Sequence, residues 1–183
     1  VIKQEAQRLG DLTTTLLALS DLDAGRVELA AVPIDTDALA GSLRARHQES
    51  GQSSQADIVI GDLGPGGASP VGDEARLLQV ASALVSNSLR YTPAGGAVSV
   101  FAEADDATWR LIVDDSGPGI AAQDRERVFE RFVRLDPSRS AAQGGSGLGL
   151  SICKRLVTLM GGAIRVEESP LGGARLVVEL PKG

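Results

Sequence analysis

A glycine-rich stretch near the C-terminal end of the chain is the first candidate for chemistry. Residues 144–150 read Gly-Gly-Ser-Gly-Leu-Gly-Leu and run directly into an amphipathic helical pattern. Such a loop lets several backbone N–H groups converge where a helix begins, which favours an anion such as a phosphate chain. No lysine follows in the spacing of a P-loop, G-x-x-x-x-G-K-[ST]. Taken alone, the stretch is equally compatible with a tight turn.

A polar stripe is expected on the long helix predicted over residues 73–91. Asn87, Arg90 and Tyr91 lie three and four positions apart, so a helix places them on one side. An asparagine oxygen can bind a hard cation, an arginine can meet a phosphate, and a tyrosine can stack on a flat ring. The same residues also suit an ordinary polar flank near a helix C-terminus.

An acidic, glycine-rich turn follows the strand predicted at residues 108–114. Residues 114–120 read Asp-Asp-Ser-Gly-Pro-Gly-Ile. A carboxylate at a strand end can accept a hydrogen bond from an exocyclic amine, and glycines let a planar ring approach the backbone. Without further context, Asp-x-Gly-Pro-Gly is also ordinary turn chemistry.

The segment between these two glycine-rich stretches shows no clear periodic pattern. It spans residues 116–147 and contains Phe-Glu-Arg-Phe at 129–132, which holds two of the three phenylalanines. A long irregular segment inside a compact domain is often a functional lid. We expect the two aromatic rings to hold it against the core and Arg131, Arg134 and Arg139 to face an anion.

The elements that must position these residues alternate along the chain. The predicted helices cover residues 35–50, 73–91 and 148–160, and the predicted strands cover residues 27–34, 57–62, 97–104, 108–114, 163–168 and 174–180. A loop at 51–56 is expected to end the first of these helices. The last four strands read as two antiparallel hairpins. We therefore predict an α+β fold of two layers, with helices on one face of a mixed, mostly antiparallel sheet.

A further helix is predicted over residues 1–23. Its apolar seam has a heptad-like spacing and consists of Ile2, Leu9, Leu12, Leu16 and Leu19. Such a seam requires a partner helix. We interpret it as half of a helical hairpin or of a dimer stalk, while a terminal helix packed on its own domain stays open.

Composition excludes several classes of function. The net charge of −6 argues against nucleic acid as the main partner. No apolar run approaches the length of a membrane span. The single cysteine, Cys153, excludes a disulfide framework and fits a reducing cytosol, and its place in a predicted helix favours a buried, inert thiol.

Taken in order, the four motifs resemble those of the catalytic and ATP-binding domain of bacterial sensor histidine kinases, in the GHKL superfamily. They match its N box, first glycine motif, F box and second glycine motif, and the resemblance spans residues 27–181. It implies a Bergerat-type two-layer α/β sandwich that binds ATP and Mg²⁺. It also divides the chain into residues 1–26, similar to the second helix of the family's dimerisation and phosphotransfer hairpin, and a catalytic domain at 27–183.

The resemblance implies a role for each matching residue. Asn87 would hold Mg²⁺ at the ATP phosphates, Arg90 would contact a phosphate, and Tyr91 would flank the purine. Asp115 would accept a hydrogen bond from the adenine amino group. The remaining implied ATP-binding residues lie in the glycine motifs and the lid: Gly117, Gly119, Ile120, Arg134, Arg139, Gly145, Ser146, Gly147, Leu148 and Gly149. Nothing in the sequence chooses between the two lid arginines for the γ-phosphate.

Two departures from the family pattern bear on the reaction. Ala83 stands where the family often has a second asparagine, and where hydrolytic relatives have a glutamate that activates the attacking hydroxyl. The chain therefore favours phosphoryl transfer to an acceptor other than water. The family's phosphoacceptor histidine is absent, because the only histidine, His47, lacks the acidic residue and the Arg-Thr-Pro that usually follow it. We expect His47 at the surface or at a helix cap.

The implied function is that of a protein-histidine kinase core, which transfers the ATP γ-phosphoryl to a histidine outside this chain for relay to a response-regulator aspartate. The expected partners are a response regulator and the upstream phosphoacceptor helix or a dimer mate, with no nucleic acid and no direct membrane contact. The implied location is the cytoplasmic portion of a bacterial inner-membrane protein. Two alternatives stay open: a stand-alone GHKL ATPase or protein-serine kinase, and a degenerate nucleotide-binding interaction module.

Overall fold

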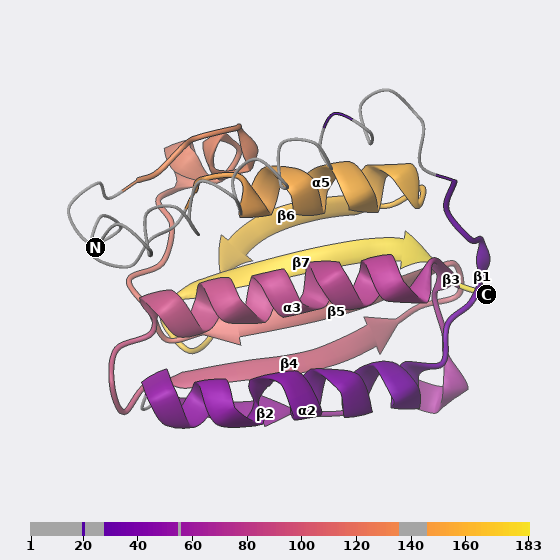
Figure 1. Ribbon diagram of the computed structural model, residues 1–183, viewed down its shortest axis with the longest axis horizontal. Helices are drawn as coiled ribbons and strands as arrows, with labels where there is room; N and C mark the ends of the chain where they lie inside the picture. Colours follow the sequence, from indigo (N-terminus) through magenta and orange to yellow (C-terminus); the bar gives the residue numbers. More distant parts are fainter. Residues whose placement is uncertain (1–19, 21–27, 55, 136–145) are drawn as a thin grey trace, which may run out of the picture.

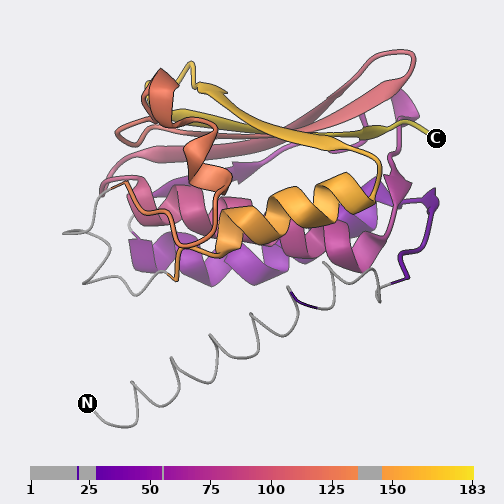
Figure 2. The ribbon, with the colours of Figure 1, turned by 90° about the horizontal axis from the view of Figure 1, so that it is seen from above.

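The described part of the chain, residue 20 and residues 28–54, 56–135 and 146–183 of the computed structural model, forms two layers (Figures 1 and 2). One face of a five-stranded sheet is covered by α2 (Thr36–Ser54), α3 (Glu74–Tyr91) and α5 (Gly149–Leu159). The strand order is β2-β4-β5-β7-β6. The strands, in that order, span Asp57–Ile60, Ala97–Ala104, Thr108–Asp115, Ala174–Pro181 and Ala163–Glu168. The predicted two-layer α+β fold is confirmed.

Strand pairing in this sheet is mixed, as predicted. β2 and β4 run parallel, while the other three neighbouring pairs are antiparallel. Outside the sheet, β1 (Val32–Pro33) pairs antiparallel with β3 (Val71–Gly72). The remaining short elements are the 3-10 turns η1 (Pro65–Gly67), η2 (Ala122–Asp124) and η3 (Arg127–Phe129).

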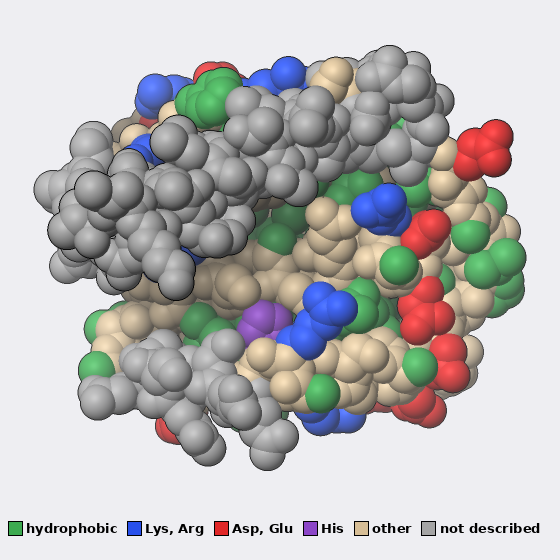
Figure 3. Space-filling model, viewed as in Figure 1, with side chains coloured by type: hydrophobic (Ala, Val, Ile, Leu, Met, Phe, Trp, Pro, Cys, Tyr) green, Lys and Arg blue, Asp and Glu red, His purple; other side chains and the backbone are tan. Residues whose placement is uncertain are grey.

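Aspartates fix where the two longer helices begin. Asp35 Oδ1 accepts hydrogen bonds from the N–H groups of Asp37 and Ala38, both at 3.0 Å. At the start of α3, Asp73 Oδ1 accepts from the N–H of Arg76 at 3.0 Å. A negative charge is stabilised at a helix N-terminus. Acidic side chains accordingly gather at this end of the helical layer (Figure 3).

The core between the sheet and the helices is aliphatic around one tryptophan. Trp109 on β5 is fully buried, and its indole N–H donates to the carbonyl oxygen of Leu63 at 2.8 Å. Leu77, Leu84 and Val85 of α3 are also fully buried, on the apolar face predicted for that helix. The hydrogen bond satisfies the one polar atom of the indole, so the ring adds buried apolar area without an unpaired donor.

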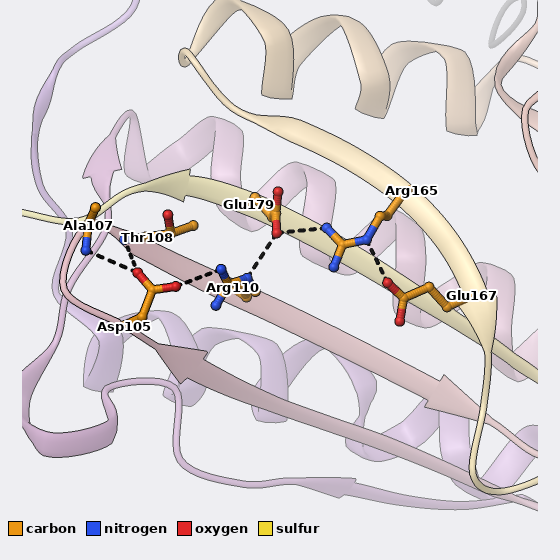
Figure 4. A network of polar contacts seen from close by, with 7 residues as sticks. All are labelled: Asp105, Ala107, Thr108, Arg110, Arg165, Glu167 and Glu179. Carbon is orange, nitrogen blue, oxygen red and sulfur yellow. Dashed lines mark hydrogen bonds and ion pairs between the residues drawn. The ribbon is translucent and has the colours of Figure 1, made fainter.

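The sheet face opposite the helices carries a chain of ion pairs (Figure 4). Arg110 on β5 lies 2.7 Å from Asp105 and 2.9 Å from Glu179. Arg165 on β6 lies 2.7 Å from Glu179 and 2.6 Å from Glu167. Hydrogen bonds from Arg110, and then from Arg165, lower the pKa of Glu179. Partly exposed pairs of this kind contribute little each, but as cross-strand neighbours they favour the register of β5, β7 and β6.

Several predicted boundaries are wrong. α2 continues to Ser54, so there is no loop at 51–54; the single glycine at 51 costs a helix only about 1 kcal/mol. The strand predicted at 27–34 is reduced to Val32–Pro33, whose partner strand has two residues, and β2 ends at Ile60. The helix predicted over residues 1–23 lies outside the described residues, apart from residue 20.

The position predicted for His47 is also wrong. The side chain is neither at the surface nor at a helix end, since it is 5% exposed within α2. Leu39, Leu43 and His47 are spaced by four, which puts the histidine on the buried stripe of the helix. Neither ring nitrogen has a hydrogen-bond partner among the described residues. Burial, and to a lesser extent the charge of Arg46, lowers the pKa of His47, so the ring is neutral.

Replacing His47 by leucine should make folding stability less sensitive to acid. The pKa of the folded histidine lies below its ordinary value of 6.5, so the unfolded chain binds the proton first as the pH falls. Stability is then lost below the unfolded pKa, by at most about 1.4 kcal/mol per pH unit for one proton. Urea unfolding followed by Trp109 fluorescence at about pH 7.5 and about pH 5.5 measures this loss. An equal loss in the wild type and in His47→Leu would contradict the account.

Candidate functional site

Three of the predicted motifs meet at one end of the two layers: the polar stripe of α3, the acidic turn after β5 and the glycine-rich stretch before α5. β5 ends, α3 ends, α5 begins and the β6–β7 turn lies at this end, on the left of Figure 1. α3 and α5 run antiparallel, with the Cys153 sulfur 4.0 Å from the carbonyl oxygen of Val80. The polar stripe of α3, the aspartate after β5 and the glycines before α5 are thereby brought to the same side of the fold.

Asp115 has one carboxylate oxygen occupied and one open. Its side chain is 5% exposed at the end of β5. Oδ1 accepts hydrogen bonds from the N–H of Gly117 at 2.9 Å and from the N–H of Ala174 at 3.0 Å. The Asp115 carbonyl oxygen accepts from the N–H of Gly173 at 3.1 Å. Oδ2 makes no hydrogen bond with any described residue, so a fixed acceptor is left for a donor such as an exocyclic amine.

The glycines after Asp115 allow close approaches of the backbone. A Cβ on Gly117 would lie 3.0 Å from Asp115 Oδ1 and 3.0 Å from the carbonyl oxygen of Tyr91. Gly119 has a φ of +70°, and its Cβ would lie 3.4 Å from the carbonyl oxygen of Gly173. The loop after β5 therefore closes against both the end of α3 and the β6–β7 turn.

The polar stripe on α3 borders this loop. Asn87 and Tyr91 are half-buried, and Arg90 is exposed in the last turn. The Asn87 amide makes no hydrogen bond within the described part of the chain. No group of three or more His, Cys, Asp or Glu residues that could hold a metal occurs among the described residues. A hard cation at Asn87 would therefore depend on its amide oxygen, on a ligand's oxygens and on water.

The first N–H groups of α5 make no hydrogen bond to any described residue. Its N-cap residue, Leu148, is fully buried and provides no side-chain cap. The N–H of Leu148 itself faces the Ser146 hydroxyl at 3.3 Å. The first N–H groups of α5, which begins at Gly149, thus remain for water or for an anion.

The lid is attached to α5 by a backbone contact between Phe132 and Gly147. The Phe132 N–H donates to the Gly147 carbonyl oxygen at 2.9 Å, and a Cβ on Gly147 would lie 2.9 Å from Phe132 Cα. Phe129 packs in the core at 5% exposure, with Lys154 Nζ 5.4 Å from its ring centre. Phe132 is 59% exposed, so the expectation that both rings hold the lid to the core is wrong for Phe132. Its φ of +64° lies in the left-handed region, which is uncommon for a residue other than glycine.

The other predicted site residues have these positions. Ile120 is half-buried, and its carbonyl oxygen accepts from Arg125 Nε at 3.2 Å. Arg134 is half-buried in the segment after Phe132. Arg139 and Gly145 lie outside the described residues.

Sequence reasoning missed the contribution of the β6–β7 turn. From the sequence alone, the two glycines at 172 and 173 are ordinary turn residues of the second predicted hairpin. Gly172 does need its φ of +93° for the turn, but a Cβ on Gly173 would overlap Asp115 Oδ1 and the Asp115 carbonyl oxygen. The second glycine therefore serves the close approach to Asp115. The sequence does contain a signal for this contact: the turn has two consecutive glycines although its backbone requires only one.

The fold is that of the catalytic domains of histidine kinases. The solved structure of the mycobacterial sensor histidine kinase MprB superposes with a TM-score of 0.68 at 30% identity, covering 84% of this chain and 98% of MprB's. Residues 72–183 match the family described as Histidine kinase-, DNA gyrase B-, and HSP90-like ATPase, and the chain belongs to that family.

Longer relatives extend the similarity over almost the whole chain. The sensor-like histidine kinase SenX3 of Mycobacterium tuberculosis is 38% identical over 97% of this chain and 43% of its own length. The signal transduction histidine-protein kinase BaeS of Escherichia coli is 36% identical over 98% of this chain and 38% of its own. Full-length ShkA, solved in complex with AMPPNP, has a TM-score of 0.84 at 30% identity, covering 98% of this chain and 37% of ShkA's. The chain thus spans less than half the length of these relatives. None of the helices in the described ranges has the length and hydropathy of a membrane span.

Replacing Gly173 by alanine should destabilise the fold by about 2–3 kcal/mol, because the new methyl group would overlap backbone and carboxylate atoms that cannot move aside freely. The matched control is Gly172→Asn in the same turn, since asparagine tolerates a positive φ and no described atom lies within 4 Å of that Cβ. We expect the control to lose less than about 1 kcal/mol. Urea unfolding monitored by Trp109 fluorescence compares the two. Equal losses would rule out a specific role for Gly173.

Proposed function

We propose that this chain is the ATP-binding core of a protein-histidine kinase and that it transfers the γ-phosphoryl group of ATP to a histidine outside residues 1–183. The observation that supports ATP most directly is Asp115, a carboxylate with Oδ1 held by two N–H groups and Oδ2 open. Membership of the ATPase family and similarity to sensor histidine kinases support the reaction class. AMPPNP in the ShkA structure supports an adenine nucleotide as the ligand.

The adenine ring is assigned to the end of β5. The Asp115 Oδ2 would accept a hydrogen bond from the 6-amino group, which guanine lacks. Gly117 leaves bare backbone beside the Asp115 carboxylate, and Gly119 does the same in the loop that follows, so a flat ring could approach closely. Tyr91, at the end of α3, would flank the ring, and Ile120 would contribute apolar surface.

The phosphates are assigned to the region between α3 and α5. Asn87 would hold Mg²⁺, which when bound neutralises the charge on the phosphate oxygens. Arg90 would contact a phosphate from the last turn of α3. The start of α5 would supply N–H donors, from the motif that comprises Gly145, Ser146, Gly147, Leu148 and Gly149. Arg134 or Arg139 would reach the γ-phosphate.

The geometry of α3 favours transfer to a protein acceptor over hydrolysis. Ala83, one turn before Asn87, packs against the core and has no group that could activate water. Glu74 is the only acidic residue of α3, and it lies thirteen residues from Asn87, which is about 20 Å along a helix. The attacking group would therefore have to carry its own base or be a nucleophile such as a neutral imidazole. His47 is buried and does not meet that need.

The partners follow from the proposed reaction. The acceptor histidine would lie on the upstream helix of a dimerisation and phosphotransfer hairpin, in the same protein or in a dimer mate. Residues 1–26 would be the second helix of that hairpin. The phosphoryl group would pass on to a response-regulator aspartate. We further propose that the chain is the cytoplasmic part of a bacterial membrane sensor, in keeping with its similarity to SenX3 and BaeS.

Phosphoryl transfer by the wild-type chain, compared with transfer by the Asn87→Ala variant, tests the proposal. With ATP labelled at the γ-phosphate, the wild-type chain should label a separately supplied phosphotransfer hairpin at its histidine, as a bond that acid breaks and alkali spares. Asn87→Ala should lose Mg²⁺-dependent binding of AMPPNP by about tenfold or more, and the transfer with it. Ser86→Ala, an exposed neighbour on the same helix, is the control and should behave as the wild type.

Two results would count against this function. Wild-type affinity of Asn87→Ala in calorimetry with Mg²⁺ would remove the metal assignment. Labelling of the isolated chain at His47, or steady ATP hydrolysis without transfer, would favour a self-contained kinase or ATPase instead.

A further inference from the structure

The β5–β7 ladder ends directly beside Asp115. Asp114 and Arg175 are its last register pair. Beyond this pair, the last residue of the β6–β7 turn and the first residue of β7 bond to Asp115: the Gly173 N–H donates to its carbonyl oxygen and the Ala174 N–H to its Oδ1. The place where the ladder stops thus decides which backbone donors reach the carboxylate.

That last pair is joined by two hydrogen bonds on the open face of the sheet. Arg175 Nε donates to Asp114 Oδ1 and Nη2 donates to Oδ2, both at 2.8 Å. The Asp114 side chain is 3% exposed and that of Arg175 is 23% exposed. The guanidinium carbon also lies 5.9 Å from the ring centre of Phe101 on β4. One arginine therefore contacts residues of three neighbouring strands, β7, β5 and β4.

Asp114 and Asp115 are coupled through their backbone. Successive side chains of a strand point to opposite faces, so the two carboxylates are joined through one peptide unit. A rotation of that unit that moved Asp115 would also pull Asp114 away from the fork of Arg175. Two parallel hydrogen bonds resist such a rotation better than a single one.

We propose that Arg175 is a positioning residue for Asp115, and that its paired hydrogen bonds to Asp114 keep Asp115 Oδ2 in the direction of the adenine amino group. This deepens the proposed function and rests on it. Arg175 touches no nucleotide in this account. It acts through Asp114, from the face of the sheet opposite the ligand.

A matched pair on the same two strands separates this role from ordinary stabilisation. Arg110 and Glu179 are also register partners of β5 and β7, on the same face, with Nε 2.9 Å from Oε1. Their side chains are 27% and 28% exposed. They lie four residues further along each strand and do not adjoin Asp115.

The experiment compares two double variants. One combines Asp114→Leu and Arg175→Leu, and the other combines Arg110→Leu and Glu179→Leu. Replacing both partners by apolar residues avoids leaving an unpaired buried charge. Calorimetry with Mg²⁺ measures the dissociation constants of AMPPNP and of its inosine counterpart, which has a 6-oxo group. Their ratio reports recognition of the base, and a uniformly lower folded fraction does not change it.

We expect the Asp114/Arg175 double variant to lose about tenfold in this ratio and the Arg110/Glu179 double variant to stay within about twofold of the wild type. Arg175→Lys keeps the positive charge but removes the two parallel hydrogen bonds, so the ratio of dissociation constants should fall about threefold. This single variant keeps the test decisive if the double variant fails to fold. An unchanged ratio in Arg175→Lys and in the folded double variant would overturn the role of Arg175 while leaving the proposed function intact. A wild-type chain without preference for the adenine analogue would overturn both.

Discussion

The candidate site depends on how one buried carboxylate is held. Asp115 Oδ1 takes its two hydrogen bonds from Gly117, two residues on, and from Ala174, which is 59 residues away in sequence. A carboxylate removed from water must be hydrogen-bonded, and backbone N–H groups supply this without a compensating charge. Because both donors go to the same oxygen, the other is left directed and unpaired within the described chain. A single acceptor of fixed direction is what selects an amino group over a carbonyl oxygen on a purine.

The rest of the fold can be understood as support for that arrangement. The β6–β7 turn reaches Asp115 only because residue 173 lacks a side chain, and the loop after β5 meets α3 only because residue 117 lacks one. The β6–β7 turn ends where the ladder between β5 and β7 begins, and the face of these strands away from the helices carries paired charges (Figure 4). On the other face, α3 and α5 bring a polar stripe and a helix start to the same end (Figure 1).

Local signals in the sequence were enough to predict most elements but not the contacts between distant ones. The helix starts near residues 35 and 73 and the hairpins of β4–β5 and β6–β7 follow from neighbouring residues, so they could be predicted. The role of Gly173 depends on an approach between strands far apart in sequence, which no local pattern encodes. The predicted surface position of His47 is wrong because a polar residue type favours exposure, whereas the spacing from Leu43 places this one on the buried stripe of α2. The exposure of Phe132 was not predictable from its type, because its backbone is left-handed and hydrogen-bonded to Gly147, fifteen residues further along the chain.

The most direct test of the account is the base preference of Asp115→Asn, measured by calorimetry of AMPPNP against its inosine counterpart. The two N–H donors require an oxygen, so the asparagine should present its Oδ1 to them and its amino group where Asp115 had Oδ2. The site would then donate where it had accepted. The account predicts that the wild type prefers the 6-amino base by about tenfold or more and that Asp115→Asn loses or reverses this preference. An undiminished preference for the adenine analogue in Asp115→Asn would contradict it.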